Sequence, residues 1–143
     1  AEAGYLYAVK AKIELTMICA VFGAGGLLGS HLVDRLLHSG HQVIGVEIFT
    51  LALKRTLGGP PEPNFELIWH DINFPIYLEL DRIYNLASPA SPKHYQSDPV
   101  QTMKTNVVGT TNLLGLAKRT GARLFQASTS EVYSDPLISP KKE

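Results

Sequence analysis

A glycine-rich turn carries the strongest chemical signal in the sequence. Gly23, Gly26 and Gly29 recur at intervals of three residues, directly after an apolar run and directly before a segment of helical periodicity. Glycine at such positions lets the backbone turn tightly and approach a pyrophosphate at a helix N-terminus, where unpaired N–H groups and the helix dipole favour an anion. The spacing predicts a nucleotide-binding loop, and a turn required only for packing is the alternative.

Acidic residues follow the next two apolar runs. Glu47 ends the run 42–46, about twenty residues beyond the glycine turn, which is the usual position of an acid that holds ribose hydroxyls. Because a carboxylate repels a 2′-phosphate, Glu47 favours NAD over NADP. Asp71, after the run 65–69, could accept a hydrogen bond from the adenine amine while Ile72 packs on the ring. An aspartate that only caps a turn is the alternative.

Hydroxyl and carboxyl groups follow the last apolar run. Thr129 and Ser130 could hydrogen-bond a substrate alcohol, and a partly desolvated Glu131 could serve as an acid or a base. From the pattern alone, residues that merely begin a loop are the alternative. Cys19 is the only cysteine and the five histidines show no ligand spacing, so we expect neither an intrachain disulfide nor a metal site.

Five strands and two helices are needed to position these residues. The predicted strands are residues 13–22, 42–46, 65–69, 82–87 and 122–127, and the predicted helices are 27–38 and 100–119. Gly40 and Gly121 stand where helices commonly end in a left-handed residue. The proline-rich stretch 88–99 is predicted to be a loop. Strands separated by helices or long crossovers predict an α/β fold with a doubly wound, Rossmann-like parallel sheet in the order 3-2-1-4-5.

The second predicted helix combines an apolar stripe with several cations. The stripe consists of Val100, Met103, Val107, Leu114 and Ala117, which recur at helical spacing. The cations are Lys104, Lys118 and Arg119, which the pattern alone assigns to the solvent-facing surface.

Composition limits the classes of function. The chain has 143 residues, 45% of them hydrophobic, which is enough for one domain with its own core. Thirteen basic residues balance thirteen acidic ones, which argues against a broad electrostatic surface for nucleic acid or an anionic membrane. The longest apolar stretch, 15–29, is too short to span a bilayer. Residues 1–12 show no clear pattern and are interpreted as a leader, without the features of a secretory signal.

Several segments together are similar to one enzyme family. They are residues 26–34, 64–71, 86–92, 104–106, 115–119 and 127–133. These segments resemble the UDP-glucuronic acid decarboxylases (UDP-xylose synthases), which are extended short-chain dehydrogenases/reductases. The resemblance runs from about residue 13 to residue 143, and the sequences SPASP and STSEVY are its most specific parts.

The resemblance implies a reaction without net oxidation. The C4 hydroxyl of UDP-glucuronate is oxidised by tightly held NAD, the resulting 4-keto acid loses carbon dioxide, and return of the hydride yields UDP-xylose. The overall class is therefore a lyase. The family also implies a homodimer formed through helices beside the sheet. Some family members are cytosolic and others are anchored in the Golgi by an N-terminal helix, and we expect the cytosol here.

The resemblance also assigns residues to roles. Gly26, Leu27, Leu28, Glu47, Asp71, Ile72, Leu86, Ser88, Thr105 and Ala127 would surround NAD. Ile76, Tyr77, Lys104, Asn112, Gly115, Lys118 and Arg119 would contact the UDP-sugar. Thr129 would hydrogen-bond the C4 oxygen, while Ser130 and Glu131 would manage the carboxylate and the proton that replaces it.

The sequence departs from the family in several places. Phe22 replaces a small hydroxyl residue before the glycine turn, Glu47 and Ile48 replace an Asp-Asn pair, and Asn85 stands where histidine is usual. No tyrosine in the chain is followed four residues later by lysine, although that pair supplies the family's catalytic base. We therefore interpret residues 13–143 as a Rossmann domain that stops before the substrate-binding region, inactive alone and weak in NAD binding.

Two other functions are alternatives to the decarboxylase. A nucleotide-sugar epimerase or 4,6-dehydratase shares the glycine turn and Asp71, although SPASP and STSE argue against it. A non-catalytic nucleotide-binding partner of a full-length enzyme is the other alternative, and the missing tyrosine–lysine pair favours it.

Overall fold

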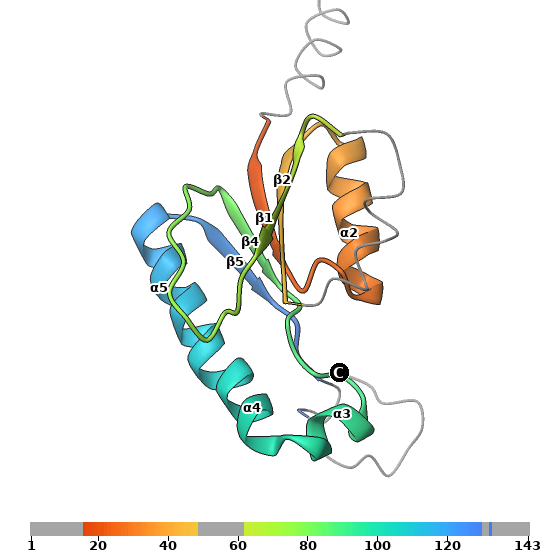
Figure 1. The fold of residues 1–143 in the computed structure, drawn as a ribbon. Coiled ribbons are helices and arrows are strands. Elements are labelled where there is room, and N and C mark those ends of the chain that lie inside the picture. Colours follow the sequence, from red (N-terminus) through yellow and green to blue (C-terminus); the bar gives the residue numbers. More distant parts are fainter. Residues whose placement is uncertain (1–15, 49–61, 130–131, 133–143) are drawn as a thin grey trace, which may run out of the picture.

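The computed structural model describes residues 16–48, 62–129 and 132. The proposed leader 1–12 and the beginning of the first predicted strand lie outside the described residues. The strands are β1 (Ile18–Phe22), β2 (Gln42–Glu47), β3 (Phe65–Trp69), β4 (Arg82–Asn85) and β5 (Arg123–Gln126). They form one parallel sheet in the order β3-β2-β1-β4-β5 (Figure 1). The predicted fold class and strand order are confirmed.

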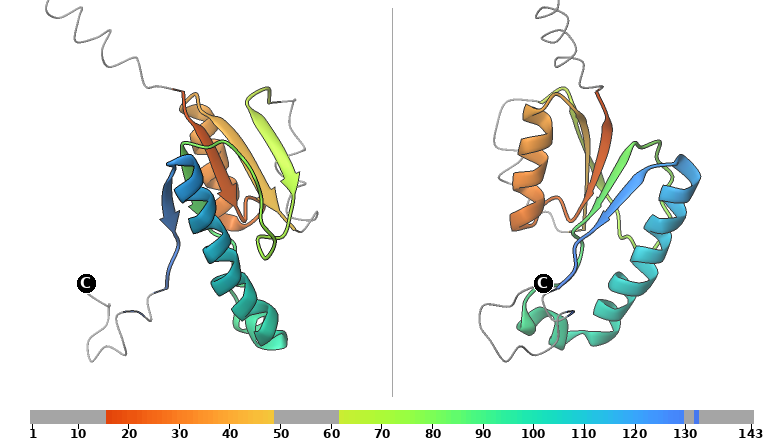
Figure 2. Two further views of the ribbon diagram at one scale, coloured as in Figure 1. Left: turned by 90° about the vertical axis from the view of Figure 1, so that its left-hand side faces the viewer. Right: turned by 180° about the vertical axis from the view of Figure 1, so that it is seen from behind.

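Helices cover both faces of the sheet. The helical segments are α2 (Leu27–His38), α3 (Pro92–Ser97), α4 (Pro99–Lys104), the π-helical turn η2 (Thr105–Gly109) and α5 (Thr110–Thr120). Figure 2 shows α2 on one side of the sheet and α5 on the other. The predicted helix ends are confirmed, because Gly40 and Gly121 both have left-handed backbone angles, with φ of 79° and 72°.

Alternation along the strands separates the core into two clusters. Cys19 and Val21 of β1 point toward α2, whereas Ala20 and Phe22 point toward α5. All four side chains are fully buried. A parallel sheet with a helix on each face buries both of its surfaces, which explains why β1 is an almost continuous apolar run rather than an alternating one.

The stretch 88–99 is not wholly a loop, so that prediction was wrong. Pro92 and Pro99 each begin a helix instead of preventing one, because proline at the first helical position loses no hydrogen bond. Asp98 caps α4, since its carboxylate accepts a hydrogen bond from the backbone N–H of Gln101 at 2.9 Å. The segments α4, η2 and α5 follow one another without a break and together form one long helical segment, residues 99–120. The Asp98 cap fixes where this segment begins, beyond the carboxyl ends of the strands.

The apolar stripe of the second predicted helix lies mainly on its outer surface. Val100, Met103, Val107 and Leu114 are all more than half exposed, and Ala117 alone packs against the core. The side facing the sheet carries Leu113 and Leu116, which are buried, and Gly109. An apolar stripe is normally the core-facing side of a helix, and here it is not.

Candidate functional site

The glycine turn brings two strand ends into close contact. The backbone N–H groups of Gly23 and Ala24 donate to the carbonyl oxygen of Val46 at 2.9 and 3.3 Å, which fixes the end of β1 against β2. Gly23 has a φ of 82°, and a Cβ at this position would lie 2.9 Å from the carbonyl group of Leu86. Only glycine satisfies both conditions without strain.

The helix that follows the turn begins without a capping side chain. Gly26 is the N-cap of α2, no side chain caps it, and its first turn contains no acidic residue. A Cβ at Gly29 would lie 2.0 Å from the carbonyl oxygen of Gly23, so the third glycine permits the close packing of helix and turn. The N–H groups of the first helical turn therefore face the turn in an arrangement that suits an anion.

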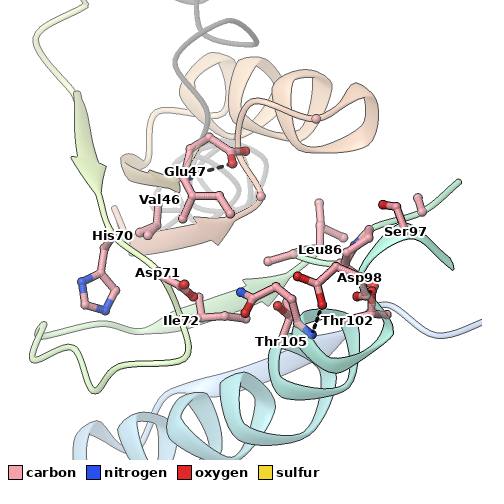
Figure 3. Close-up of a pocket in the computed structure, with 18 residues that line it drawn as sticks. Val46, Glu47, His70, Asp71, Ile72, Leu86, Ser97, Asp98, Thr102 and Thr105 are labelled. Atoms are coloured by element: carbon pink, nitrogen blue, oxygen red, sulfur yellow. Dashed lines mark hydrogen bonds between the residues drawn. The ribbon is translucent and has the colours of Figure 1, made fainter. Parts of the chain in front are cut away.

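A hollow of about 660 Å³ lies at the carboxyl ends of the strands. It brings together eight of the residues predicted to surround a dinucleotide, namely Gly23, Gly26, Glu47, Asp71, Ile72, Leu86, Ser88 and Thr105. Figure 3 shows Glu47 on one wall, and Thr102 and Thr105 of the long helical segment on the opposite wall. Leu27, Leu28, Gly29 and Ala127 do not line this hollow.

The hollow also has lining residues that were not predicted to contact a ligand. They are Val46, Ile48, His70, Ala87, Pro89, Ala90, Ser97, Asp98, Gln101 and Thr102. Asp98, Gln101, Thr102 and Thr105 stand at positions i, i+3, i+4 and i+7, and this polar helical periodicity could have revealed one side facing a ligand. The apolar stripe on the opposite side obscured it.

Backbone N–H groups hold the carboxylate of Glu47 at the edge of the hollow. Oε2 accepts a hydrogen bond from the N–H of Gly25 at 3.0 Å, and Oε1 accepts one from the N–H of Ile48 at 2.8 Å. The side chain therefore connects the glycine turn to the end of β2. This geometry places a negative charge beside the glycine turn, and hydroxyl groups of a ligand could donate to it.

Asp71 caps a turn and also lines the hollow, so its two interpretations are compatible. Its Oδ1 accepts from the N–H of Asn73 at 2.9 Å, and its carbonyl oxygen accepts from the N–H of Phe74 at 3.0 Å. Ile72 is only 5% exposed. Its side chain lies against Gly109, where a Cβ would approach it to 2.4 Å.

Thr129, the one described residue of the predicted catalytic segment 129–131, lies at the same edge of the sheet. Thr129 is exposed and follows β5, and its carbonyl oxygen accepts a hydrogen bond from the N–H of Val132 at 3.3 Å. Ser130 and Glu131 lie outside the described residues. The chemical roles of these three residues stay predictions.

A second hollow of about 220 Å³ contains most of the residues predicted to contact a UDP-sugar. It is lined by Pro75, Ile76, Tyr77, Thr111, Asn112, Gly115, Leu116 and Arg119, and it shares no lining residue with the first hollow. Lys104 and Lys118 are exposed and line neither. The structure thus separates these residues from the glycine turn, and their substrate contacts stay a prediction.

The polar groups of the second hollow have partners within the protein. The guanidinium group of Arg119 forms an ion pair with Glu79 at 2.5 Å and donates to the carbonyl oxygen of Leu78. It also lies 6.0 Å from the centre of the Tyr77 ring. The amide of Asn112 donates to the carbonyl oxygen of Ile72 at 2.9 Å. These contacts fasten the crossover between β3 and β4 to α5.

The remaining reactive groups form no further site in the described part of the chain. Burial raises the pKa of the Cys19 thiol, with a smaller opposing effect of Arg82, so the buried thiol stays neutral. Residues 16–48, 62–129 and 132 contain no group of histidine, cysteine or carboxylate ligands that could hold a metal. Among the same residues, no helix is long and apolar enough to cross a membrane.

The fold is that of the doubly wound, Rossmann-like α/β proteins, and sequence comparison agrees with this class. The model of the NAD dependent epimerase/dehydratase family matches residues 19–143. The chain belongs to this family.

The curated relatives include proteins named UDP-glucuronic acid decarboxylase. Decarboxylase 1 of Danio rerio is 52% identical, and decarboxylase 4 of Arabidopsis thaliana is 56% identical, each over 124 residues. Each alignment covers 86% of this chain but only 30% and 28% of the relative. The predicted resemblance is confirmed, and the chain spans less than a third of the length of these relatives.

Solved structures share the fold. A UDP-N-acetylglucosamine 4-epimerase from Methanobrevibacter ruminantium superposes with a TM-score of 0.77 at 25% identity, over 90% of this chain and 43% of the epimerase. WbmG of Bordetella bronchiseptica, in complex with NAD, superposes with a TM-score of 0.74 at 22% identity, over 91% of this chain and 43% of WbmG.

Proposed function

We propose that this chain forms the NAD-binding part of a UDP-glucuronate decarboxylase. The observation that carries the proposal is the hollow beside the glycine turn, where Glu47 and Asp71 lie in the positions expected for dinucleotide recognition. Identity of 52–56% to proteins named UDP-glucuronic acid decarboxylase supports the substrate class. The activity of the whole protein is part of the proposal, because the aligned region is less than a third of those relatives.

The residues of the hollow fit a dinucleotide. The turn is so tight that a Cβ at Gly23 or Gly29 would collide with backbone atoms, and the uncapped N-terminus of α2 beside it would bind the pyrophosphate. Glu47 would accept hydrogen bonds from ribose hydroxyls, and its charge would disfavour a 2′-phosphate. Asp71 and Ile72 would contact the adenine. When bound, NAD supplies an acceptor and later a donor of hydride for C4 of the sugar.

The groups after β5 would act on the sugar. Thr129 would donate a hydrogen bond to the C4 oxygen, which carries the electron pair when carbon dioxide leaves from the adjacent carbon. Ser130 and Glu131 would orient the carboxylate and deliver the proton that replaces it at C5. The position of Thr129 at the carboxyl edge of the parallel sheet supports these roles, because ligands of doubly wound folds bind along that edge.

Product analysis tests the reaction. The protein expressed from the complete gene is incubated with UDP-glucuronate, and we expect equal amounts of UDP-xylose and carbon dioxide. The second candidate is a nucleotide-sugar 4-epimerase, favoured by the similarity to solved epimerases. It would instead give UDP-galacturonate without carbon dioxide, and that outcome would replace the decarboxylase proposal.

The outer surface of the long helical segment supports self-association. Val100, Met103, Val107 and Leu114 form an exposed apolar stripe along α4, η2 and α5. A stripe of this spacing can pack against the same stripe of a second copy. We assign it to a homodimer.

A further inference from the structure

A buried amide joins two strand ends at the edge of the hollow. Asn85 is the last residue of β4 and is 1% exposed. It is in register with Phe22 of β1 and with Gln126 of β5. Its side chain points to the same face of the sheet as Ile83, which belongs to the apolar core cluster. A primary amide in such surroundings requires hydrogen-bonding partners, because an unpaired one is costly to bury.

The amide of Asn85 contacts three separate segments. Its Nδ2 donates to Oε1 of Gln126 at 2.8 Å and lies 3.4 Å from Oγ1 of Thr110 in α5. Its Oδ1 accepts from the backbone N–H of Ala87 at 3.2 Å. One side chain therefore fixes the end of β5, the start of α5 and the turn after β4 relative to one another.

Through its contact with Ala87, the Asn85 amide supports the wall of the hollow that the turn after β4 forms. Leu86 and Ala87 line the hollow, and the backbone of Leu86 lies directly against the glycine turn. The N–H of Leu86 donates to the carbonyl oxygen of Phe22 at 2.9 Å, immediately before Gly23. A movement of the turn after β4 would therefore change the space available beside Gly23.

Through its contact with Gln126, the Asn85 amide supports the residues that lead from β5 to Thr129. The N–H of Ala127 donates to the carbonyl oxygen of Asn85 at 3.0 Å. Nε2 of Gln126 donates to the carbonyl oxygen of Ala127 at 2.9 Å, and Oε1 of the same Gln126 accepts from Asn85. The orientation of Gln126, and with it the backbone two residues before Thr129, depends on the Asn85 amide.

We propose that Asn85 is a positioning residue, which holds the wall of the cofactor hollow and the segment leading to Thr129 in one fixed relation. This role rests on the proposed binding of NAD. Under the proposed function, Asn85 would contact neither NAD nor the UDP-sugar and would act through Ala87, Gln126 and Ala127. Because an amide does not titrate, the arrangement keeps the same hydrogen bonds as the pH changes.

Asn85→Asp tests this role with almost no change of shape. The ionised carboxylate cannot donate to Oε1 of Gln126, whereas the protonated form can, and burial raises the pKa of such a carboxyl group. By calorimetry at a temperature where the variant is folded, we expect N85D to bind NAD about tenfold more weakly than the wild type at about pH 8. At about pH 5.5 the NAD affinities of N85D and the wild type should differ by no more than about threefold.

Two further variants control for charge and for folding. Asn64→Asp introduces the same charge at an exposed position away from both hollows and should leave the affinity ratio near one at both pH values. Gln126→Leu removes the partner at an exposed position, where the chain tolerates the change, and should weaken NAD binding without the pH dependence. Wild-type affinity of N85D at about pH 8 together with wild-type affinity of Q126L would overturn the role of Asn85.

A second measurement separates this role from NAD binding itself. If the protein expressed from the complete gene binds no NAD, the proposed function fails, but the positioning can still be measured by amide hydrogen exchange in this chain. We then expect exchange of the Ala127 amide to accelerate by about tenfold or more in Q126L, while the Ala20 amide in β1 stays protected. Equal protection of Ala127 in Q126L and the wild type would contradict the proposal.

Discussion

At the scale of single residues, Glu47 combines a structural role with the recognition role that we propose for it. Its two carboxylate oxygens already accept hydrogen bonds from Gly25 and Ile48, so the charge is fixed before any ligand arrives. A fixed charge recognises hydroxyl groups without the entropic cost of ordering a side chain on binding. The same hydrogen bonds connect the glycine turn to the end of β2, so a substitution that removes both acceptor oxygens of Glu47 also removes this connection.

Glu47→Gln should weaken NAD binding and relax the discrimination against NADP. Loss of the charge removes charge-assisted hydrogen bonds to ribose, and we expect NAD affinity to fall by about tenfold. NADP affinity should fall less or rise, because the repulsion of the 2′-phosphate disappears. Calorimetry with both dinucleotides measures this. Glu66→Gln on the exposed side of β3 is the matched control, and an unchanged NAD affinity in E47Q would exclude Glu47 from the site.

Gly29 of α2, which packs against the glycine turn, and Gly115 of α5 should respond oppositely to replacement by alanine. Gly29→Ala places a Cβ 2.0 Å from the carbonyl oxygen of Gly23, so the turn must move, and we expect a loss of about 1–3 kcal/mol in the free energy of unfolding. Gly115→Ala meets nothing within 4 Å in α5 and should gain about 0.5–1 kcal/mol. Urea unfolding measures both, and a stable G29A variant would show that the turn is not closely packed.

At the scale of elements, the sequence predicted the sheet well because its strands are buried on both faces. Continuous apolar runs such as β1 have few other interpretations, and the glycines that end the helices fixed the boundaries. The inner face of the long helical segment was harder to predict, because its residues Thr102 and Thr105 are polar where they line the hollow. In a sequence, polar residues that line a hollow have the same pattern as polar residues on a solvent-facing surface.

Other features of the site depend on contacts that one sequence does not reveal. Asn112 and Arg119 bind the crossover through partners 40 and 41 residues away, and no local pattern indicates those pairs. The helix α3 was missed because Pro92 was interpreted as a loop residue, although proline also begins helices. Long-range contacts and the dual role of proline therefore account for what the sequence did not predict.

Adjacent leucines test which side of α5 faces the core. Leu113 is fully buried and Leu114 is 53% exposed. Leu113→Ala should lower the free energy of unfolding by about 2–5 kcal/mol, because it leaves a cavity in the core. Leu114→Ala should change it by less than about 0.5 kcal/mol at protein concentrations low enough to keep the chain monomeric. Chemical denaturation measures both, and equal losses would contradict the orientation of this helix.

At the scale of the whole molecule, the two sides of the long helical segment serve different purposes. Its inner side supplies Thr105 to the hollow beside the glycine turn and Leu113 to the core. Its outer side exposes the apolar stripe, which lies on the opposite side of the same helix. The proposed association through this stripe would therefore cover one side of a segment whose other side lines the hollow.

Charge within the stripe should therefore prevent association. Val107 is 60% exposed, and Val107→Glu would place a carboxylate against an apolar surface of the second copy, where its desolvation is unfavourable. We expect the wild-type chain to show a concentration-dependent dimer in sedimentation equilibrium and V107E to weaken the association by at least about tenfold. Phe74→Glu changes an equally exposed apolar residue outside the stripe and should leave the dimer intact. A wild-type chain that is monomeric at every concentration, or a dimer equally weakened by F74E, would show that the stripe is not the interface.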